Sequence, residues 1–263
     1  MVGHLLLRGM LVGVVAGLLA FGFAKLFGEP PIERAIAFEA QMGSHAGHTH
    51  SHDHAGQGAG SGDHADHADH STGEPEAELV SRGTQAGLGL LTGMVVYGAA
   101  IGGLFALAFA FIHGRIGDQG PRATAALLAL AGFVAMVLVP AIKYPANPPA
   151  VGDPATIGAR TALFFIMLAF SVAALAAAVA LARKLQARFG AWDAALIAGA
   201  AFVVTIALVQ YVLPAVNEVP DHFSAVVLWR FRVASLGMHL VLWATIGLLF
   251  GFLSERAAAR PSA

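Results

Sequence analysis

Eight histidines lie within residues 44–71, in a segment that otherwise holds only Asp, Gly, Ala, Ser, Thr and Gln. Imidazole nitrogens at this density, interleaved with carboxylates, form a flexible multidentate ligand for a borderline divalent metal ion. Nothing in this histidine tract can build a hydrophobic core. Its candidate metal ligands are His45, His48, His50, His52, His54, His64, His67, His70, Asp63, Asp66 and Asp69.

Two other uses of the histidine tract stay open. The same composition could serve as a nonspecific metal buffer or as a pH-sensitive spacer with no part in an ion path. Glycines at alternate positions from 56 to 62 separate the two halves of the tract. We therefore expect modest affinity and fast exchange, which suits capture of an ion better than storage.

A second set of candidate ligands lies where the backbone must be irregular. The run 143–149 contains three prolines in five positions, which leave carbonyl groups unpaired, and its asparagine adds an amide oxygen. Carboxylates and an imidazole follow within six residues near position 220, and another histidine lies about two turns into the last apolar segment. These candidate path residues are Asn147, Glu218, Asp221, His222 and His239. A rigid turn without a ligand, and a histidine that only bonds a neighbouring helix, are the alternatives.

The composition of the chain excludes an ordinary globular protein. Hydrophobic residues make up 57% of the 263 residues and charged residues 12%, with a mean hydropathy of +0.70. Six stretches are long and apolar enough to cross a bilayer, which takes about 20 residues each. We predict an all-α integral membrane protein with six transmembrane helices, at 5–26, 86–112, 123–142, 161–182, 194–213 and 233–253.

These helices divide the chain into membrane and loop segments, with a long disordered histidine-rich loop after the first helix. The predicted segments are 1–27 for the first helix, 28–85 for the extracytoplasmic loop, 86–142 for the second and third helices, 143–160 for a Pro-rich outer loop, 161–213 for the fourth and fifth helices, 214–232 for an outer loop, and 233–263 for the sixth helix and a cytoplasmic tail.

The first helix is predicted to be retained rather than removed as a signal peptide. Its apolar run is long for a signal core, and no small-x-small cleavage site precedes Lys25. Gly9, Gly13 and Gly17 follow at four-residue spacing, which places them on one face that another helix can approach closely. Glycine as ordinary membrane-helix background is the alternative.

The distribution of charge predicts the orientation. Residues 35–81 hold eight acidic residues and no Lys or Arg, whereas the turn after the fourth helix holds Arg183, Lys184 and Arg188. Positive residues favour the cytoplasmic side of a membrane. We expect both termini in the cytoplasm and the histidine tract outside.

Three arginines each open a predicted helix, at spacings of 78 and 72 residues. This pattern favours three two-helix hairpins in parallel repeat. We expect the three arginines on the outer side, where they either reach lipid headgroups or pair with acidic residues of neighbouring loops. The residues with a predicted structural or gating role are Lys143, Pro145, Pro148, Arg82, Arg160 and Arg232.

Other function classes find no support in the sequence. The chain has no cysteine, which excludes disulfides and thiolate metal sites. It has no phosphate-binding loop and no nucleophile accompanied by a base and an orienting group, so we expect neither an enzyme nor a permanent cofactor. A net charge of -1 leaves no basic surface for nucleic acid.

Three motifs carry a resemblance to a known family. They are Arg82-Gly83-Thr84-Gln85, the region from Tyr97-Gly98 to Leu107, and the run Lys143-Tyr144-Pro145-Ala146-Asn147-Pro148-Pro149-Ala150-Val151-Gly152 with Thr156 to Thr161 behind it. Over nearly its whole length the chain resembles the CbtA family of predicted cobalt transporters. The resemblance implies a protein of the bacterial inner membrane in cobalamin-linked cobalt uptake, acting beside CbtB, a small single-span subunit.

The residues and the resemblance together predict uptake of a divalent metal ion, captured by the histidine tract and passed through the helices. The resemblance favours Co(II), whereas the general affinity order places Ni(II), Cu(II) and often Zn(II) ahead of it at histidine ligands. A metal exporter and a non-transporting subunit that senses metal or delivers it to a permease are the alternatives. The expected partners are the lipid bilayer, a CbtB-type subunit and further copies of the chain.

Overall fold

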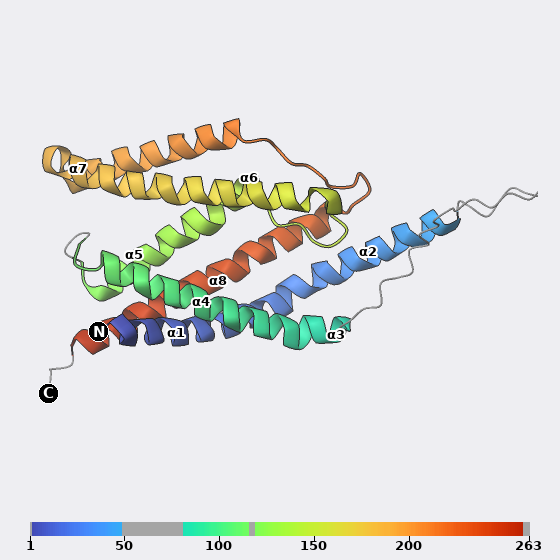
Figure 1. Cartoon of the computed structure of the whole chain (residues 1–263), viewed down its shortest axis with the longest axis horizontal. Coiled ribbons are helices and arrows are strands. Elements are labelled where there is room, and N and C mark those ends of the chain that lie inside the picture. The colour runs from blue at the N-terminus through green and yellow to red at the C-terminus, as the bar shows by residue number, and fades with distance from the viewer. Residues whose placement is uncertain (1, 49–80, 116–118, 260–263) are drawn as a thin grey trace, which may run out of the picture.

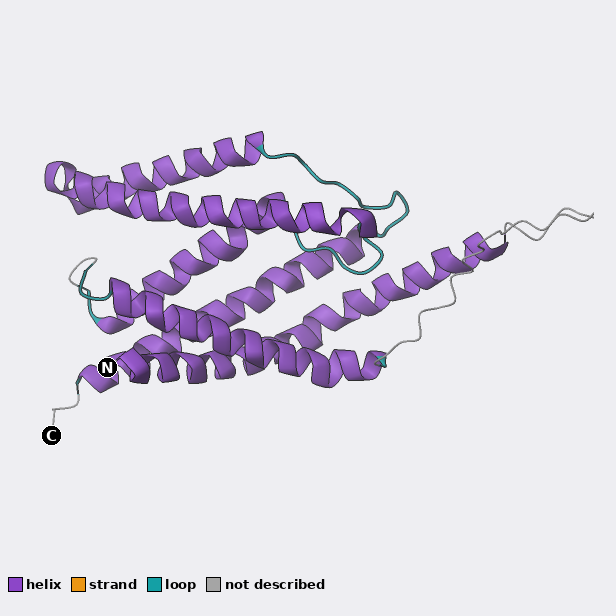
Figure 2. Ribbon diagram, in the orientation of Figure 1, coloured by secondary structure: helices purple, strands orange, loops and turns teal. Residues whose placement is uncertain are grey.

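The computed structural model describes residues 2–48, 81–115 and 119–259, and every regular element in these ranges is helical (Figure 2). The predicted all-α class is therefore confirmed for this part of the chain. Three of the elements, η1 to η3, are π-helical turns and η4 is a 3-10 turn. In order, the elements are α1 (Val2–Phe23), η1 (Ala24–Gly28), α2 (Glu29–His48), α3 (Arg82–Thr84), η2 (Gln85–Gly89), α4 (Leu90–Ile112), α5 (Pro121–Phe133), η3 (Val134–Leu138), α6 (Val139–Lys143), η4 (Pro154–Thr156), α7 (Ile157–Val212) and α8 (Ala225–Ala258).

Five helices of the described chain are long and apolar enough to cross a membrane, where the sequence predicts six. They are Val2–Met42, Arg82–Ile112, Pro121–Lys143, Pro154–Val212 and Ala225–Ala258. The difference lies in α7, which covers two predicted helices and the turn between them. Gly190 interrupts α7 with φ 80° and ψ 168°, a backbone conformation that glycine adopts readily, and Figure 1 shows α7 turning back on itself there.

The first helix is longer than the sequence predicts. An outer loop is expected from residue 28, but the chain passes through η1 and α2 and stays helical to His48. Pro30 and Pro31 lack the N–H groups that would bond the carbonyls four residues earlier, which usually ends or kinks a helix. Here those carbonyls belong to the π-turn η1, whose extra residue accommodates the prolines.

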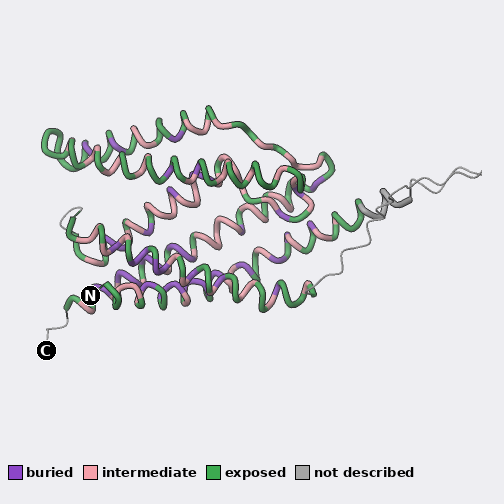
Figure 3. Tube along the Cα trace, viewed as in Figure 1, coloured by how far each residue is buried: buried purple, intermediate pink, exposed green. Residues whose placement is uncertain are grey.

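The main core lies where α1, α4, α5 and α8 pack together. Figure 3 shows buried residues along these helices and few along α7. Val12, Ile246 and Phe250 are among the fully buried side chains of this core. The two arms of α7 lie to one side (Figure 1), joined to the bundle by a smaller cluster that includes Met167 and Ile206. Apolar side chains cover the outer surface of α7, as a lipid environment favours.

The closest helix contact is between α1 and α4. A Cβ atom added to Gly9 or Gly13 would overlap the carbonyl oxygen of Gly102 or Gly98, and Gly17 makes the same kind of contact one step further on. Each step runs four residues forward in α1 and four back in α4, so the helices are antiparallel. The predicted close-approach face is therefore confirmed, and we call this contact the glycine seam.

We expect Gly13→Ala to destabilise the fold by about 1–3 kcal/mol, because the new methyl group must push α4 away. Gly93→Ala in α4 is the matched control, since a Cβ there meets no atom within 4 Å and alanine favours a helix over glycine by about 0.5–1 kcal/mol. Thermal unfolding of the purified proteins in detergent measures both effects. Equal changes in Tm for the two variants would contradict the assignment of the glycine seam.

Candidate functional site

Polar contacts gather at one end of the bundle. Figure 1 shows α3 and the starts of α7 and α8 at the end opposite to the two chain termini. Arg82, Arg160 and Arg232 lie in these segments, and each binds an oxygen atom from a distant part of the chain. We call this the arginine end.

Glu218 is the centre of the first polar cluster at the arginine end. Its Oε1 accepts a hydrogen bond from the Thr156 hydroxyl at 2.6 Å, and its Oε2 accepts one from the backbone N–H of Asp153 at 2.8 Å. The same Oε2 lies 3.2 Å from Nε of Arg160. These hydrogen bonds and the charge of Arg160 lower the pKa of Glu218 below its ordinary value of 4.5. Both carboxylate oxygens of this predicted path residue are thus held by donors of the protein.

Gly152 makes room for this cluster. Its φ is 114°, and an added Cβ would lie 2.5–2.8 Å from the guanidinium group of Arg160. Any other residue would therefore be strained in its backbone and would displace the arginine. The next residue, Asp153, accepts a hydrogen bond from the backbone N–H of Ala155 at 2.8 Å and so begins η4.

The second cluster fastens the Pro-rich segment to α7 and α8. Arg232 donates to Oδ1 of Asn147 at 2.9 Å and to the carbonyl of Ala146 at 3.4 Å. The Tyr144 hydroxyl donates to the carbonyl of Pro214 at 2.8 Å. The amide oxygen that we predicted as a metal ligand therefore holds an arginine in this structure.

The third contact is an ion pair of Arg82 whose acidic partner the sequence analysis did not name. Arg82 lies 2.7 Å from Oε2 of Glu29, and the exposed fractions of their side chains are 36% and 8%. Four residues earlier in the first helix, Lys25 donates to the carbonyl of Ala86 at 3.1 Å. Both contacts continue the glycine seam in its four-residue register. The signal was present in the sequence, because the glycine spacing extended along the helix reaches Lys25 and Glu29.

His239 lies in α8 with its Nδ1 2.9 Å from the carbonyl oxygen of Ser235. A carbonyl only accepts, so Nδ1 carries the proton and Nε2 keeps its lone pair in the neutral ring. The partner belongs to the same helix rather than to a neighbouring one. The ring also meets Tyr97 edge to face, with centroids 6.4 Å apart. This tautomer is the one that ligates a metal through Nε2.

The remaining predicted ligands are not gathered into one site. Asp221 and His222 are exposed in the loop before α8. Among the described residues no three His, Asp or Glu side chains come together as a metal site would require. Lys143 ends α6, and Pro145 and Pro148 lie in the irregular segment after it, which is the position predicted for them.

The histidine tract connects the end of α2 to the start of α3. His45 and His48 lie in the last turns of α2. The other predicted ligands of the tract lie outside the described residues; they are His50, His52, His54, His64, His67, His70, Asp63, Asp66 and Asp69.

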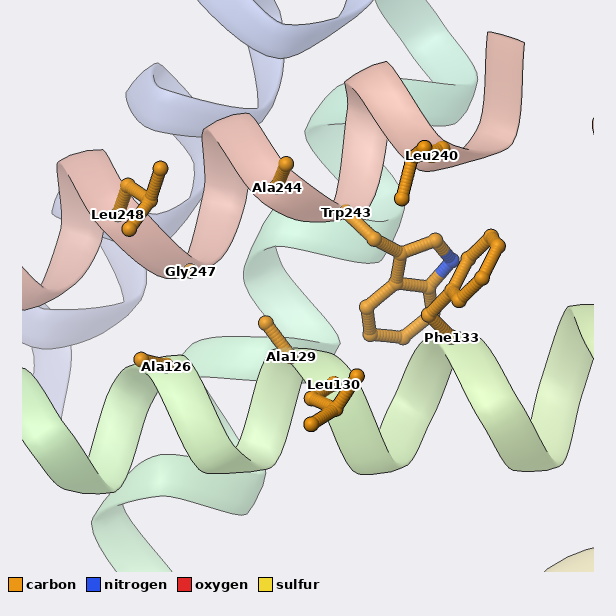
Figure 4. Close-up of a pocket in the computed structure, with 9 residues that line it drawn as sticks. All are labelled: Ala126, Ala129, Leu130, Phe133, Leu240, Trp243, Ala244, Gly247 and Leu248. Carbon is orange, nitrogen blue, oxygen red and sulfur yellow. The ribbon is translucent and has the colours of Figure 1, made fainter. Parts of the chain in front are cut away.

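A cavity of about 200 Å³ lies between α5 and α8 (Figure 4). The rings of Trp243 and Phe133 lie next to each other in it, and the other labelled residues are aliphatic or glycine. The indole nitrogen of Trp243 is buried with no hydrogen-bond partner among the described residues. This wall offers no ligand to a cation, so the cavity is not a candidate path site.

Comparison with known proteins identifies one family. A family model described as "Probable cobalt transporter subunit (CbtA)" matches residues 2–255, which is nearly the whole chain. No match was found among curated proteins or among solved structures.

The lowered pKa of Glu218 predicts a pH-dependent stability. The contribution of ionised Glu218 to the free energy of unfolding is fully present at a pH above its unfolded-state pKa near 4.5. It is lost as the pH falls through the lower pKa of the folded state. The Tm of the wild type should therefore exceed that of Glu218→Gln most at neutral pH, and the two should converge in acid. Asp221→Asn, an exposed residue of the same loop, is the control and should follow the wild type throughout. A difference for Glu218→Gln that does not change with pH would contradict this prediction.

Proposed function

The chain belongs to the CbtA family of probable cobalt transporter subunits, and from this premise we propose that it takes up divalent cobalt across the bacterial inner membrane. In this proposal the histidine tract captures the ion and the helical bundle passes it on. No chemical step is catalysed, so the protein is not an enzyme.

The observation that carries the proposal is the place of the histidine tract in the chain. A segment with eight imidazoles joins α2 to α3, and both of these helices lead into the glycine seam. An ion bound on the tract is thereby tethered to the bundle, which raises its local concentration there without any new contact. Alternating histidines on a glycine-rich segment bind and release quickly, as capture requires.

The topology that fits this role has six crossings, with each arm of α7 counted as one. An even number of crossings puts both termini on one side, and Figure 1 supports this because it draws both at one end. We place that side in the cytoplasm and the arginine end outside, because positive residues cluster in the turn of α7 near Arg188.

The candidate path residues have different roles in the proposal. Asn147 and Glu218 already bind arginines, so they position the loops of the arginine end. Among the described residues no hydrogen-bond partner contacts Nε2 of His239, so it is the best-placed ligand of the candidate path residues, whereas Asp221 and His222 are exposed at the entrance. Cobalt is favoured through the family, and Ni(II) and Zn(II) are expected to compete at the histidine tract.

A delivery role is the second candidate, and the family description favours it by calling the protein a subunit. In that case the chain binds metal but moves it only with a partner, which we expect to be a small single-span CbtB-type subunit. Proteoliposomes that contain this chain alone would then bind cobalt without accumulating it. Export of the metal predicts the opposite direction of flux, and the same vesicles distinguish it.

Replacing residues 44–71 by a Gly/Ser segment of equal length tests the capture role. We expect the apparent KM for radioactive cobalt uptake in cells to rise on the order of tenfold, with the maximal rate retained. Loss of all flux, although the protein reaches the membrane, would make the tract part of the path. Uptake that never depends on the chain would contradict the importer proposal.

The capture role also predicts a dependence on pH. Only neutral imidazole binds a metal ion, so cobalt uptake at low concentration should fall as the pH drops through about 6.5. The Gly/Ser replacement is the control, because its uptake should lose this dependence. Wild-type uptake that is undiminished at pH 5.5, measured across the same concentration series, would contradict capture by the histidines.

A further inference from the structure

A second cavity, of about 190 Å³, lies near the arginine end between the first helix, α4 and α8. Most of its wall is apolar, and the residues in it with ligand atoms in their side chains are Glu29, Ser235 and Met238. Carboxylate, hydroxyl and thioether are donors that a borderline divalent ion accepts. His239, whose Nε2 has no hydrogen-bond partner in the part of the chain that the structure describes, is the next residue of α8.

Glu29 is unusual in this setting. Its side chain is 8% exposed, and among the described residues it is the only buried ionisable one. A buried ion pair is a poor source of stability, because two apolar residues of similar volume often stabilise a fold as well or better. Ionisable residues in membrane helices are costly and usually mark a pathway. Stability alone therefore does not explain Glu29.

The backbone around Glu29 is irregular on both sides of the seam. The π-turn η1 ends directly before Glu29, and the π-turn η2 follows α3, which carries Arg82. Lys25 of η1 donates to the carbonyl of Ala86 in η2. Such breaks in membrane helices are tolerated where the segment is buried or lines a cavity, and π-turns are frequent at functional sites.

We propose that Glu29, Ser235 and Met238 form an inner binding site for the transported divalent cation, and that Arg82 forms an ion pair with Glu29 when no cation is bound there. This inference rests on the proposed transport function. An arriving ion replaces the guanidinium as the counter-charge of Glu29, and Arg82, whose side chain is 36% exposed, moves outward. A single carboxylate with neutral donors, and with Lys25 close by, holds the ion weakly enough to let it pass on.

The absence of cysteine from the chain allows a direct test. A thiolate bound to Co(II) gives a sulfur-to-metal charge-transfer absorption that imidazole and carboxylate ligands do not give. We expect purified full-length Glu29→Cys to gain this band as CoCl₂ is added, although its histidine tract also binds metal. Glu33→Cys, an exposed position one turn further along α2, is the matched control and should show no band. Bands of equal strength in both variants, or a band in neither, would overturn the proposal.

Uptake measurements separate an ion site from a structural ion pair. Glu29→Gln should lower the maximal rate of cobalt uptake by about tenfold or more, and Glu33→Gln should leave it unchanged. Arg82→Gln removes the competitor of the metal, so the apparent KM should fall. A purely structural pair predicts instead that both single variants lower the amount of folded protein and impair uptake in the same direction.

The double variant Glu29→Gln with Arg82→Gln guards against simple misfolding, because it leaves no buried charge unpaired. We expect it to fold, as judged by thermal unfolding, and still to transport poorly. Wild-type transport by this double variant would overturn the proposal. A thiolate band in Glu29→Cys together with no uptake by the wild type would keep the metal site and reject the importer function.

Discussion

The contact of α1 with α4 along the glycine seam determines where the charged residues of the first helix lie. Without side chains at Gly13 and Gly98, the two backbones approach until one carbonyl occupies the space of the missing Cβ. This fixes the register of the antiparallel pair. The same four-residue steps then bring Lys25 to Ala86 and Glu29 to Arg82.

Residues at four-residue spacing do not normally stay on one face of a long α-helix. Four residues of an α-helix turn about 40° beyond one full turn, so positions at this spacing leave a straight interface after a few steps. The π-turns η1 and η2 lie opposite each other, where Lys25 meets Ala86. A π-turn has i→i+5 hydrogen bonds and therefore more residues per turn than an α-helix, so four residues rotate by a smaller angle around the helix axis. The register therefore continues as far as the ion pair of Glu29 with Arg82.

The sequence predicted the parts of this structure that depend on local patterns. Apolar runs of membrane length located the helices, and the spacing of Gly9, Gly13 and Gly17 identified the close-approach face. It did not predict the helix after residue 28, because a proline pair ordinarily ends a helix and only the π-turn, which depends on its surroundings, lets it continue.

Partners of polar residues were harder to predict. The arginines were expected to reach lipid headgroups or to pair with loop acids, and Arg160 pairs with such an acid, Glu218. Arg232 instead binds the amide oxygen of Asn147. The sequence does not distinguish a side-chain oxygen that binds a metal ion from one that binds an arginine. Only the fold, which brings residues 60 to 90 positions apart together, distinguishes the two.

Under the proposed function, selectivity for cobalt would require a second step after capture by the histidine tract. A histidine tract by itself follows the general affinity order and retains Ni(II) or Cu(II) more strongly than Co(II), so it concentrates metal ions without choosing among them. At the proposed inner site, the choice among metal ions would depend on the free energy of replacing water and Arg82 by a particular ion at Glu29. Because a single carboxylate supplies the charge there, the outcome depends on the geometry of the neutral donors and on how readily the ion loses water. An arginine that returns to Glu29 after the ion has left would close the same path against back-flow, so one residue would serve both selectivity and direction.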